Sequence, residues 1–385
     1  MTKVFVASSG LGRIWRGFEV SAREFFDELR HEDALEISLF KGGGHSAENE
    51  IVRWNLPREN RLTAFVAWCI RRSPYYVEEI TFALSLLPHI QREKPDVIYF
   101  ADWSVGKLLL AARKLLRMDF KLMLCNGAAY KPPLDMWDHV HQVSLPHFEF
   151  AARSGHPDER QSLVPHALVM HDDIPLPCAF EREALRRKLD LPNDRPIVLS
   201  VAAIDKLTKR LDYVITELGA LPEPRPFFLM LGQKTEATRA IETLADEMLG
   251  PDGYAIFTVP HAEVKNYYLA ADALVLGSLM EGFGLVLAEA MSYGLPCLTH
   301  DYNVPEFVLG EFAHMTDFTT KGNLTALFAK VLAQRNDDTL RRARHASVYE
   351  RFSWEKLRPA YVEMLEFCAG KSPAEKSPPA AMFSA

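Results

Sequence analysis

The chain alternates short apolar runs with longer amphipathic stretches, and this rhythm is clearest in its second half. Runs rich in Val, Ile, Leu and Phe predict buried parallel strands at residues 196–202, 226–232, 254–259, 273–277 and 296–300. Helical spacing between them predicts helices near residues 210–218, 236–248, 262–271 and 285–293. Strands that alternate with helices of this length are typical of a doubly wound α/β sheet.

The first half repeats the pattern less regularly. Apolar runs predict strands at residues 3–8, 34–40, 96–100 and 121–126, with helices at 18–30 and 104–116. A polar, proline-bearing stretch at 171–177 separates the two rhythms, so we expect one domain at residues 1–172 and a second at 173–352. A last helix is expected at 353–368, and the Pro- and Ser-rich segment 369–385 is predicted to be disordered.

The amino-acid composition argues against several classes of protein. The 44 basic and 51 acidic residues leave a net charge of −7, so the excess of basic residues typical of nucleic-acid binders is missing and no nucleic-acid partner is expected. The five cysteines are scattered without C-x-x-C spacing, which argues against a disulfide framework or a zinc site. No apolar run approaches the length of a membrane span or a signal peptide, so we expect a cytoplasmic protein.

The chemistry that stands out is a pair of glutamates, Glu281 and Glu289, which lie eight positions apart with a Gly-Phe-Gly between them. Glu289 falls inside an apolar helical run, where a carboxylate is costly unless something bonds to it. The glycines permit close approach of a ligand, and the N–H groups of the following helical turn favour an anion such as phosphate. In an open α/β sheet this place faces the ligand crevice.

The stretch EGFGLVLAEAMSYGLPCL, residues 281–298, resembles the E-x7-E signature of retaining GT-B glycosyltransferases, especially glycosyltransferase family 4. The resemblance implies two Rossmann-like domains that face a cleft, with the last helix crossing back onto the first domain. In that family the first glutamate contacts the hydroxyls of the donor sugar and the second contacts the ribose, which assigns these roles to Glu281 and Glu289. A short core helix with one half-buried glutamate is the alternative for such a pair.

The stretch LSVAAIDKLTKRLDYVI, residues 199–215, resembles the strand and loop whose lysine contacts the donor diphosphate, which places Lys209 in that role with Arg210 beside it. Many members carry an arginine soon after this strand, whereas this chain has Ala203. Lys206, Lys209 or Arg210 then compensates, or the donor binds more weakly. An exposed basic loop is the alternative.

The resemblance implies three sets of site residues. The catalytic set is Glu281, Lys209 and Arg210. The donor-binding set is Glu289, Gly282, Phe283, Gly284, Leu285, Gly12 and Val259. The acceptor-side set is Gly10, Arg13 and Asn126, where Asn126 stands at a position that many members fill with histidine. An ordinary tight turn is the alternative for the Gly10 to Arg13 loop.

No metal and no cofactor are expected. The nucleotide-diphosphate sugar is expected to bind as a substrate. There is no D-x-D sequence, and the histidines lack zinc-site spacing: His139, His141, His147 and His166. The acceptor is expected to be a glycan, a lipid or a small molecule. The basic amphipathic stretch at 107–121 either touches the inner membrane as a peripheral contact or is a Rossmann helix with a solvated cationic face.

Three other functions stay open. A nucleotide-sugar epimerase or a phosphorylase can use the same fold. A non-catalytic protein that binds a nucleotide sugar is compatible with the departures at Ala203 and Asn126. A nicotinamide oxidoreductase ranks third, because Trp15 stands where a dinucleotide fingerprint has its third glycine.

Overall fold

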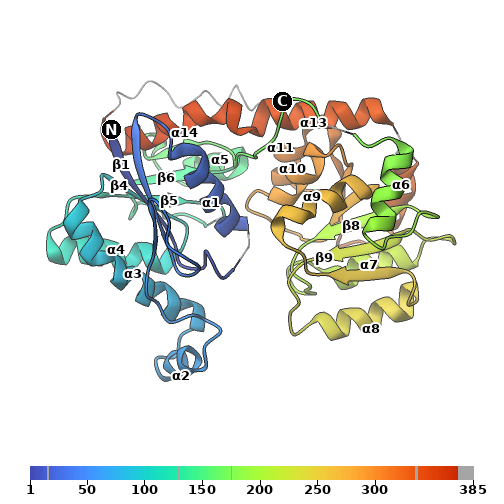
Figure 1. Ribbon diagram of the computed structural model, residues 1–385, viewed down its shortest axis with the longest axis horizontal. Helices are drawn as coiled ribbons and strands as arrows, with labels where there is room; N and C mark the ends of the chain where they lie inside the picture. The colour runs from blue at the N-terminus through green and yellow to red at the C-terminus, as the bar shows by residue number, and fades with distance from the viewer. Residues whose placement is uncertain (15–16, 129, 175, 334–336, 372–385) are drawn as a thin grey trace. The chain divides into compact units, whose positions relative to one another are not determined.

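The computed structural model describes residues 1–385 except 15–16, 129, 175, 334–336 and 372–385 (Figure 1). The chain forms two compact units: the first joins residues 1–169 with the segment that begins at Trp354, and the second holds residues 170–353. Each unit contains one parallel sheet covered by helices, so the predicted fold class of two Rossmann-like units is confirmed. Trp15 and residues 372–385 of the predicted disordered tail lie outside the described residues. The start of that tail, residues 369–371, is ordered instead, since Ala369 extends the hydrogen bonding of the last helix and Lys371 pairs with Asp96 at 2.6 Å.

The sheet of the first unit has seven strands in the order β3-β2-β1-β4-β5-β6-β7. Every neighbouring pair is parallel. The strands are β1 (Thr2–Ser8), β2 (Leu35–Lys41), β3 (Glu50–Val52), β4 (Val97–Phe100), β5 (Lys121–Cys125), β6 (His139–Gln142) and β7 (Gln161–Leu163).

Helices cover both faces of this sheet. On one face α3 (Pro74–Glu93) and α4 (Trp103–Leu116) pack over an apolar core that includes Phe5, Phe82 and Leu109. On the other face α1 (Gly17–Leu29) packs against α14 (Trp354–Cys368), and the Tyr361 hydroxyl donates to the carbonyl of Pro165 at 2.9 Å. The remaining helices of the unit are α2 (Arg61–Cys69), α5 (Leu145–Arg153) and a 3-10 turn at Asp158–Arg160.

The second unit has a six-stranded parallel sheet in the order β10-β9-β8-β11-β12-β13. Its strands are β8 (Ile197–Val201), β9 (Phe227–Leu231), β10 (Tyr254–Phe257), β11 (Ala273–Leu276), β12 (Cys297–His300) and β13 (His314–Thr316). Its helices are α6 (Ala179–Lys188), α7 (Leu211–Gly219), α8 (Thr238–Leu249), α9 (His261–Ala270), α10 (Leu285–Ser292), α11 (Asn303–Leu309), α12 (Asn323–Leu332) and α13 (Asp338–Phe352), with a 3-10 turn at Gly310–Phe312. The strands and helices predicted for this half are confirmed within a few residues.

The apolar pattern did not predict four short strands: β3, β6, β7 and β13. Strand β6 reads His-Val-His-Gln, so it has no apolar run, yet all four residues are buried. Neighbouring side chains satisfy its polar groups, since His139 bonds Ser162 at 2.8 Å and the Asn126 amide donates to Gln142 at 2.9 Å. Burial of a polar strand depends on such partners, which only the folded chain supplies.

In both sheets the strand order reverses beside a central strand, between β1 and β4 and between β8 and β11. Ligands of open α/β sheets bind at these switch points, outside the carboxyl ends of the strands. The loops after β8 and β11 carry Lys209 and Glu281, whereas those after β1 and β4 carry Gly10 to Arg13 and Asp102. The topology therefore gathers most predicted site residues into one group per unit.

Candidate active site

The switch point of the second unit holds an ion pair between Lys209 and Glu281. The Lys209 Nζ atom lies 2.6 Å from Glu281 Oε1, and both side chains are partly open to solvent, with 27% and 19% of their surface exposed. Gly277 lets the loops approach, because a Cβ at this position would lie 2.5 Å from the Lys209 carbonyl oxygen. The structure thus brings together two of the three residues in the predicted catalytic set.

A tight turn positions Lys209. Asp205 accepts hydrogen bonds from the backbone N–H of Thr208 at 2.9 Å and from that of Leu207, together with the Thr208 hydroxyl. Partial burial disfavours the charged carboxylate, but these donors outweigh burial and lower the pKa of Asp205. The turn is therefore built on an ionised carboxylate. Lys206 and Ala203 are exposed on the same loop.

Arg210 ends this loop in a left-handed conformation, with φ at 49°, directly before α7. Its guanidinium lies over the Tyr213 ring, 4.5 Å from the ring centroid, and donates to the Phe318 carbonyl at 3.2 Å. Among the described residues, its buried Nη1 atom has no hydrogen-bond partner. Arg210 is therefore anchored by the protein while one N–H group can still bond an anion.

Helix α10 begins directly after the Gly-Phe-Gly segment. Gly284 adopts a left-handed conformation with φ at 80°, which a residue with a Cβ adopts only with strain, and Phe283 is buried. Leu285 is the first helical residue. The Leu287 N–H donates to the Gly284 carbonyl at 2.8 Å. The N–H groups at the very start of a helix have no acceptor one turn before them and, with the helix dipole, favour an anion.

Glu289 has a protein partner that the sequence pattern did not indicate. The Tyr268 hydroxyl on α9 donates to Glu289 Oε2 at 2.7 Å. Burial, followed by the charge of Glu289, raises the pKa of Tyr268 well above its ordinary value, so this phenol stays a donor. Tyr293 stacks on Tyr268 with ring centroids 5.5 Å apart. The carboxylate is therefore tolerated because a buried tyrosine bonds it.

Further polar groups border the carboxyl ends of β8, β11 and β12. The described part of the chain offers no hydrogen-bond partner to four buried hydroxyls there: Ser200, Ser278, Thr299 and Tyr302. Burial and the nearby charge of Glu281 raise the pKa of Tyr302. Buried hydroxyls are normally hydrogen-bonded, so these four are polar groups near one end of the sheet to which the described residues supply no partner. Sequence reasoning missed all four, because single Ser, Thr and Tyr residues carry no pattern.

Val259, which was predicted to bind the donor, is half-buried. It follows β10 at the end of the neighbouring β9-β10 pair.

The predicted residues of the first unit form a tightly packed loop. Gly12 has φ at 91°, and a Cβ there would lie 2.2 Å from the Gly43 carbonyl oxygen. The Arg13 guanidinium donates to Asn55 at 2.8 Å and to Glu78 at 2.9 Å, and a Cβ on Gly10 would meet Glu19 at 2.4 Å. The glycine run at 42–44, to which the sequence pattern assigned no role, is what this loop packs against.

Asn126 is also held by the protein. Its side chain bonds Gln142 and both the N–H and the carbonyl of Tyr130, and only 1% of its surface is exposed. It therefore orders the loop after β5.

Burial lowers the pKa of three histidines near this strand, to about 3 for His139 and His166 and about 4 for His141, so they are neutral. His147 bonds the Ser144 hydroxyl at 2.7 Å. Within the described ranges, no group of three or more His, Cys, Asp or Glu residues could hold a metal ion.

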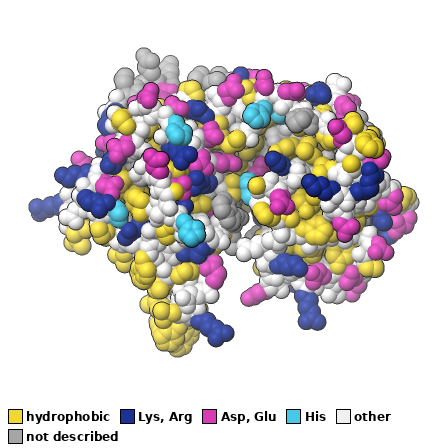
Figure 2. Space-filling view, viewed as in Figure 1, with side chains coloured by type: hydrophobic (Ala, Val, Ile, Leu, Met, Phe, Trp, Pro, Cys, Tyr) yellow, Lys and Arg dark blue, Asp and Glu magenta, His cyan; other side chains and the backbone are white. Residues whose placement is uncertain are grey.

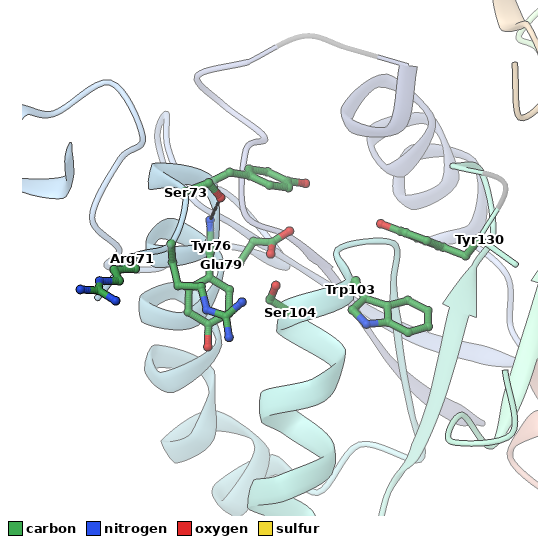
Figure 3. A pocket seen from close by; sticks show the side chains of 9 residues that line it. Arg71, Ser73, Tyr76, Glu79, Trp103, Ser104 and Tyr130 are labelled. Atoms are coloured by element: carbon green, nitrogen blue, oxygen red, sulfur yellow. Dashed lines mark hydrogen bonds between the residues drawn. The ribbon is translucent and has the colours of Figure 1, made fainter. Parts of the chain in front are cut away.

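A cavity of about 450 Å³ lies beside the switch point of the first unit (Figure 3). It is lined by residues from the start of α3, the start of α4 and the loop after β5: Arg71, Arg72, Ser73, Tyr75, Tyr76, Glu79, Trp103, Ser104 and Tyr130. The Glu79 carboxylate and the Tyr130 hydroxyl point toward the same space (Figure 3). Aromatic faces with a few convergent polar groups are typical of a small-ligand pocket.

The Glu79 carboxyl group in this pocket has a raised pKa. Burial, and then the charge of Asp102, raise the pKa of Glu79 from 4.5 to about 7. Asp102 itself accepts hydrogen bonds from the Tyr75 and Ser9 hydroxyls, both at 2.7 Å, which ties the pocket to the end of β1. A carboxyl that changes charge near neutral pH inside a pocket is a candidate ligand-binding group.

Part of the second unit is similar to a known family. The model of the family described as glycosyl transferases group 1 matches residues 181–347, which include Lys209, Glu281 and Glu289. The D-inositol 3-phosphate glycosyltransferase of Xylanimonas cellulosilytica is 29% identical over 203 residues, which are 51% of this chain and 48% of that protein. The sulfoquinovosyl transferase SQD2 of Arabidopsis thaliana is 26% identical over 258 residues, 58% of this chain and 46% of that protein. The chain thus spans about half the length of these relatives.

Solved structures match along almost the whole chain. Sucrose-phosphate synthase from Thermosynechococcus elongatus superposes with a TM-score of 0.77 over 97% of this chain and 100% of that one, at 18% identity. Anabaena HepE, solved with UDP and glucose, gives a TM-score of 0.71 over 95% of this chain and 100% of that one, at 13% identity. At such identities the match speaks for the fold alone, which is the GT-B arrangement of two Rossmann-like units.

Proposed function

We propose that this chain, whose residues 181–347 match the group 1 glycosyltransferases, transfers a sugar from a nucleotide-diphosphate donor to an acceptor hydroxyl, with retention and without a metal. The observation that carries the proposal is the Lys209–Glu281 pair at the switch point of the second sheet, beside the first turn of α10. A cation, helix N–H groups and a carboxylate at one sheet edge suit a ligand that joins a diphosphate to a sugar. The proposed setting is cytoplasmic.

In this mechanism the sugar leaves its diphosphate through an oxocarbenium-like state. Lys209, the N–H groups of the first turn of α10 and the unbonded Nη1 of Arg210 would take up the negative charge that develops on the leaving phosphate. Glu281 would bond hydroxyls of the sugar while its charge orients Lys209. The chain's own residues supply charge stabilisation and orientation. The nucleophile is the acceptor hydroxyl, whose proton would pass to the leaving diphosphate as the bond between that diphosphate and the sugar breaks and the new glycosidic bond forms.

The nucleoside is proposed to lie toward Glu289. A ribose hydroxyl there would share the carboxylate with Tyr268, whose hydrogen bond already orients it. The backbone around Val259 would contact the base. HepE is described in complex with UDP and glucose, so uridine diphosphate is the first nucleotide to try.

The acceptor is proposed to bind in the first unit, in the cavity lined by Trp103, Tyr130 and Glu79. Aromatic faces pack against the apolar faces of sugar rings, and carboxylates accept hydrogen bonds from sugar hydroxyls. Gly10, Gly12, Arg13 and Asn126 would then act mainly by holding the loops around the cavity, because the side chains of Arg13 and Asn126 are already bonded within the unit.

Thermal unfolding in the presence of UDP, GDP, ADP, TDP and NAD, each with and without EDTA, tests the proposal. A ligand at 100 times its dissociation constant stabilises the native state by about 2.7 kcal/mol, which corresponds to a shift of several degrees. We expect one nucleoside diphosphate to raise the midpoint equally in EDTA. A shift with NAD alone would point to an oxidoreductase, and a shift that requires a metal would contradict metal-free binding.

Product analysis separates the remaining functions. Free nucleotide that appears only when an acceptor is present indicates transfer. Conversion of the donor without acceptor would indicate an epimerase, and binding without any turnover would indicate a non-catalytic protein. The stereochemistry of the product, read by NMR, tests retention.

A further inference from the structure

The most unusual surface of the molecule lies on α2, in the first unit. Its apolar side chains point to solvent, with exposed fractions of 60% for Phe65 and 75% for Trp68. Trp54, Leu62 and Ile70 beside them are 64%, 54% and 49% exposed. Figure 2 shows hydrophobic side chains gathered at the foot of the first unit, where Figure 1 places α2 away from the sheet. Apolar side chains clustered in this way mark a site of interaction.

The rest of α2 explains why these side chains stay outside. Its buried residues are Thr63 and Ala67, which are small and lie on the side that packs against α3. Asn60 caps the helix through a hydrogen bond to the N–H of Leu62 at 2.9 Å. The helix is thus capped and packed through its small residues, while its large apolar residues face solvent. This arrangement indicates that the exposed side chains contact a partner outside the unit.

The charges around this helix identify the chemistry of the partner. Arg61, Arg71 and Arg72 are exposed at its two ends, and Glu59 is the acidic residue within positions 54–72. The chain as a whole carries a net charge of −7, so this basic rim departs from the average of the protein. Tryptophan and phenylalanine flanked by arginine suit the boundary between anionic headgroups and acyl chains. A helix of nine residues can lie in that boundary, and among the described helices none could cross a bilayer.

We propose that the α2 surface, made of Trp54, Leu62, Phe65, Trp68 and Ile70 with the rim Arg61, Arg71 and Arg72, docks the first unit on a lipid bilayer that carries anionic headgroups. The apolar side chains enter the boundary region and the arginines bind the phosphates of the headgroups. Each arginine near an anionic surface should strengthen binding roughly fivefold, and this contribution falls as salt rises.

The basic helix α4 is the surface for which the sequence pattern allowed a membrane contact, and it is less suited. Val105, Leu109 and Ala112 of α4 are buried in the unit, and Arg113 is paired with Asp138 and bonded to the Phe120 carbonyl. Leu115 and Leu116 remain exposed, by 82% and 52%. These two leucines provide a control pair of similar exposure on another helix of the same unit.

The proposed docking has a consequence for the acceptor, which rests on the proposed function. Arg71 and Arg72 join α2 to α3 and also line the cavity beside Glu79. A unit docked through α2 would therefore hold the mouth of this cavity near the headgroups. An acceptor exposed at the membrane surface could then reach the pocket without leaving the membrane.

Flotation of the full chain with vesicles tests the docking. We expect binding to vesicles of phosphatidylcholine with about 30% phosphatidylglycerol, and at least about tenfold weaker binding to pure phosphatidylcholine. The double variant Phe65→Ser/Trp68→Ser should lose at least about tenfold, and Arg61→Gln roughly fivefold. Leu115→Ser/Leu116→Ser should bind as the parent does.

Several outcomes would overturn the proposal. These are absence of binding to anionic vesicles, equal binding to neutral ones, or loss of binding only in the α4 variant. Sedimentation that shows a dimer abolished by Phe65→Ser/Trp68→Ser, without vesicle binding, would assign the surface to a second copy instead. The nucleotide-induced thermal shift should be unchanged in all of these variants, which keeps a failure of docking distinct from a failure of the proposed function.

Discussion

The two units share the reversal of strand order but differ in how they use charge at the switch point. In the second unit Lys209 pairs with Glu281, and both side chains stay partly exposed beside a helix N-terminus. In the first unit Arg13 and Arg58 both pair with the fully buried Glu78, and Glu79 lines an aromatic cavity. Arg71 and Arg72 also line this cavity. One topology thus presents a partly exposed lysine–glutamate pair beside a helix N-terminus in one unit and an aromatic cavity with a buried carboxyl group in the other. Open α/β sheets bind ligands at the switch point, and here a few loop side chains give the two switch points different charge and shape.

The largest effect is expected from Lys209→Met, which removes the cation from the second switch point. Turnover should fall by about 10²–10³-fold, as when one preorganised group that stabilises a leaving anion is removed. Steady-state kinetics measures the loss. Lys206→Met, on the same loop but exposed, is the matched variant. A similar loss in both variants would mean that the phosphate lies elsewhere on this loop.

A large effect on stability is expected from Gly12→Ala in the first unit. Alanine at this position would have to adopt a strained left-handed conformation, and its Cβ would clash with the Gly43 backbone. The free energy of unfolding should therefore fall by about 3 kcal/mol. Gly155→Ala shares the positive φ, at 89°, but its Cβ would meet nothing within 4 Å, so it should cost about 1 kcal/mol. Urea unfolding of both variants gives the difference. Equal losses would show that the Gly12–Gly43 contact is not essential.

A moderate effect on donor binding is expected from Glu289→Ala. The variant loses the carboxylate and leaves the buried Tyr268 hydroxyl without its acceptor, so nucleotide affinity should fall about tenfold or more, in line with a hydrogen bond to a charged group. Calorimetric titration with the nucleotide measures it. Tyr268→Phe keeps the carboxylate and should lose less. Glu281→Ala should lower turnover more than affinity, and full activity in both glutamate variants would contradict the site.

A pH-dependent effect on stability concerns Glu79. Its pKa is raised from 4.5 to about 7 in the native state, so between these pH values the unfolded chain releases a proton that the native chain keeps. Native stability should therefore fall as pH rises through this window, by on the order of 2 kcal/mol, and Glu79→Gln should remove this fall. Unfolding curves at about pH 5, 6, 7 and 8 measure it across the window. An unchanged slope in the variant would show that Glu79 is not the group that titrates.

Much of the second unit was predictable because its parallel strands are buried on both faces and read as apolar runs, and because Glu281, Glu289 and Lys209 follow a local spacing. The sequence also determined that two such units are present, since alternation of strands and helices is a local property. The contact of Glu289 with Tyr268, the buried hydroxyls beside β8 and β11, and the cavity at Glu79 were decided by the tertiary structure. Each of these joins residues distant in the chain, and single polar residues leave no periodic signal until folding brings their partners within bonding distance.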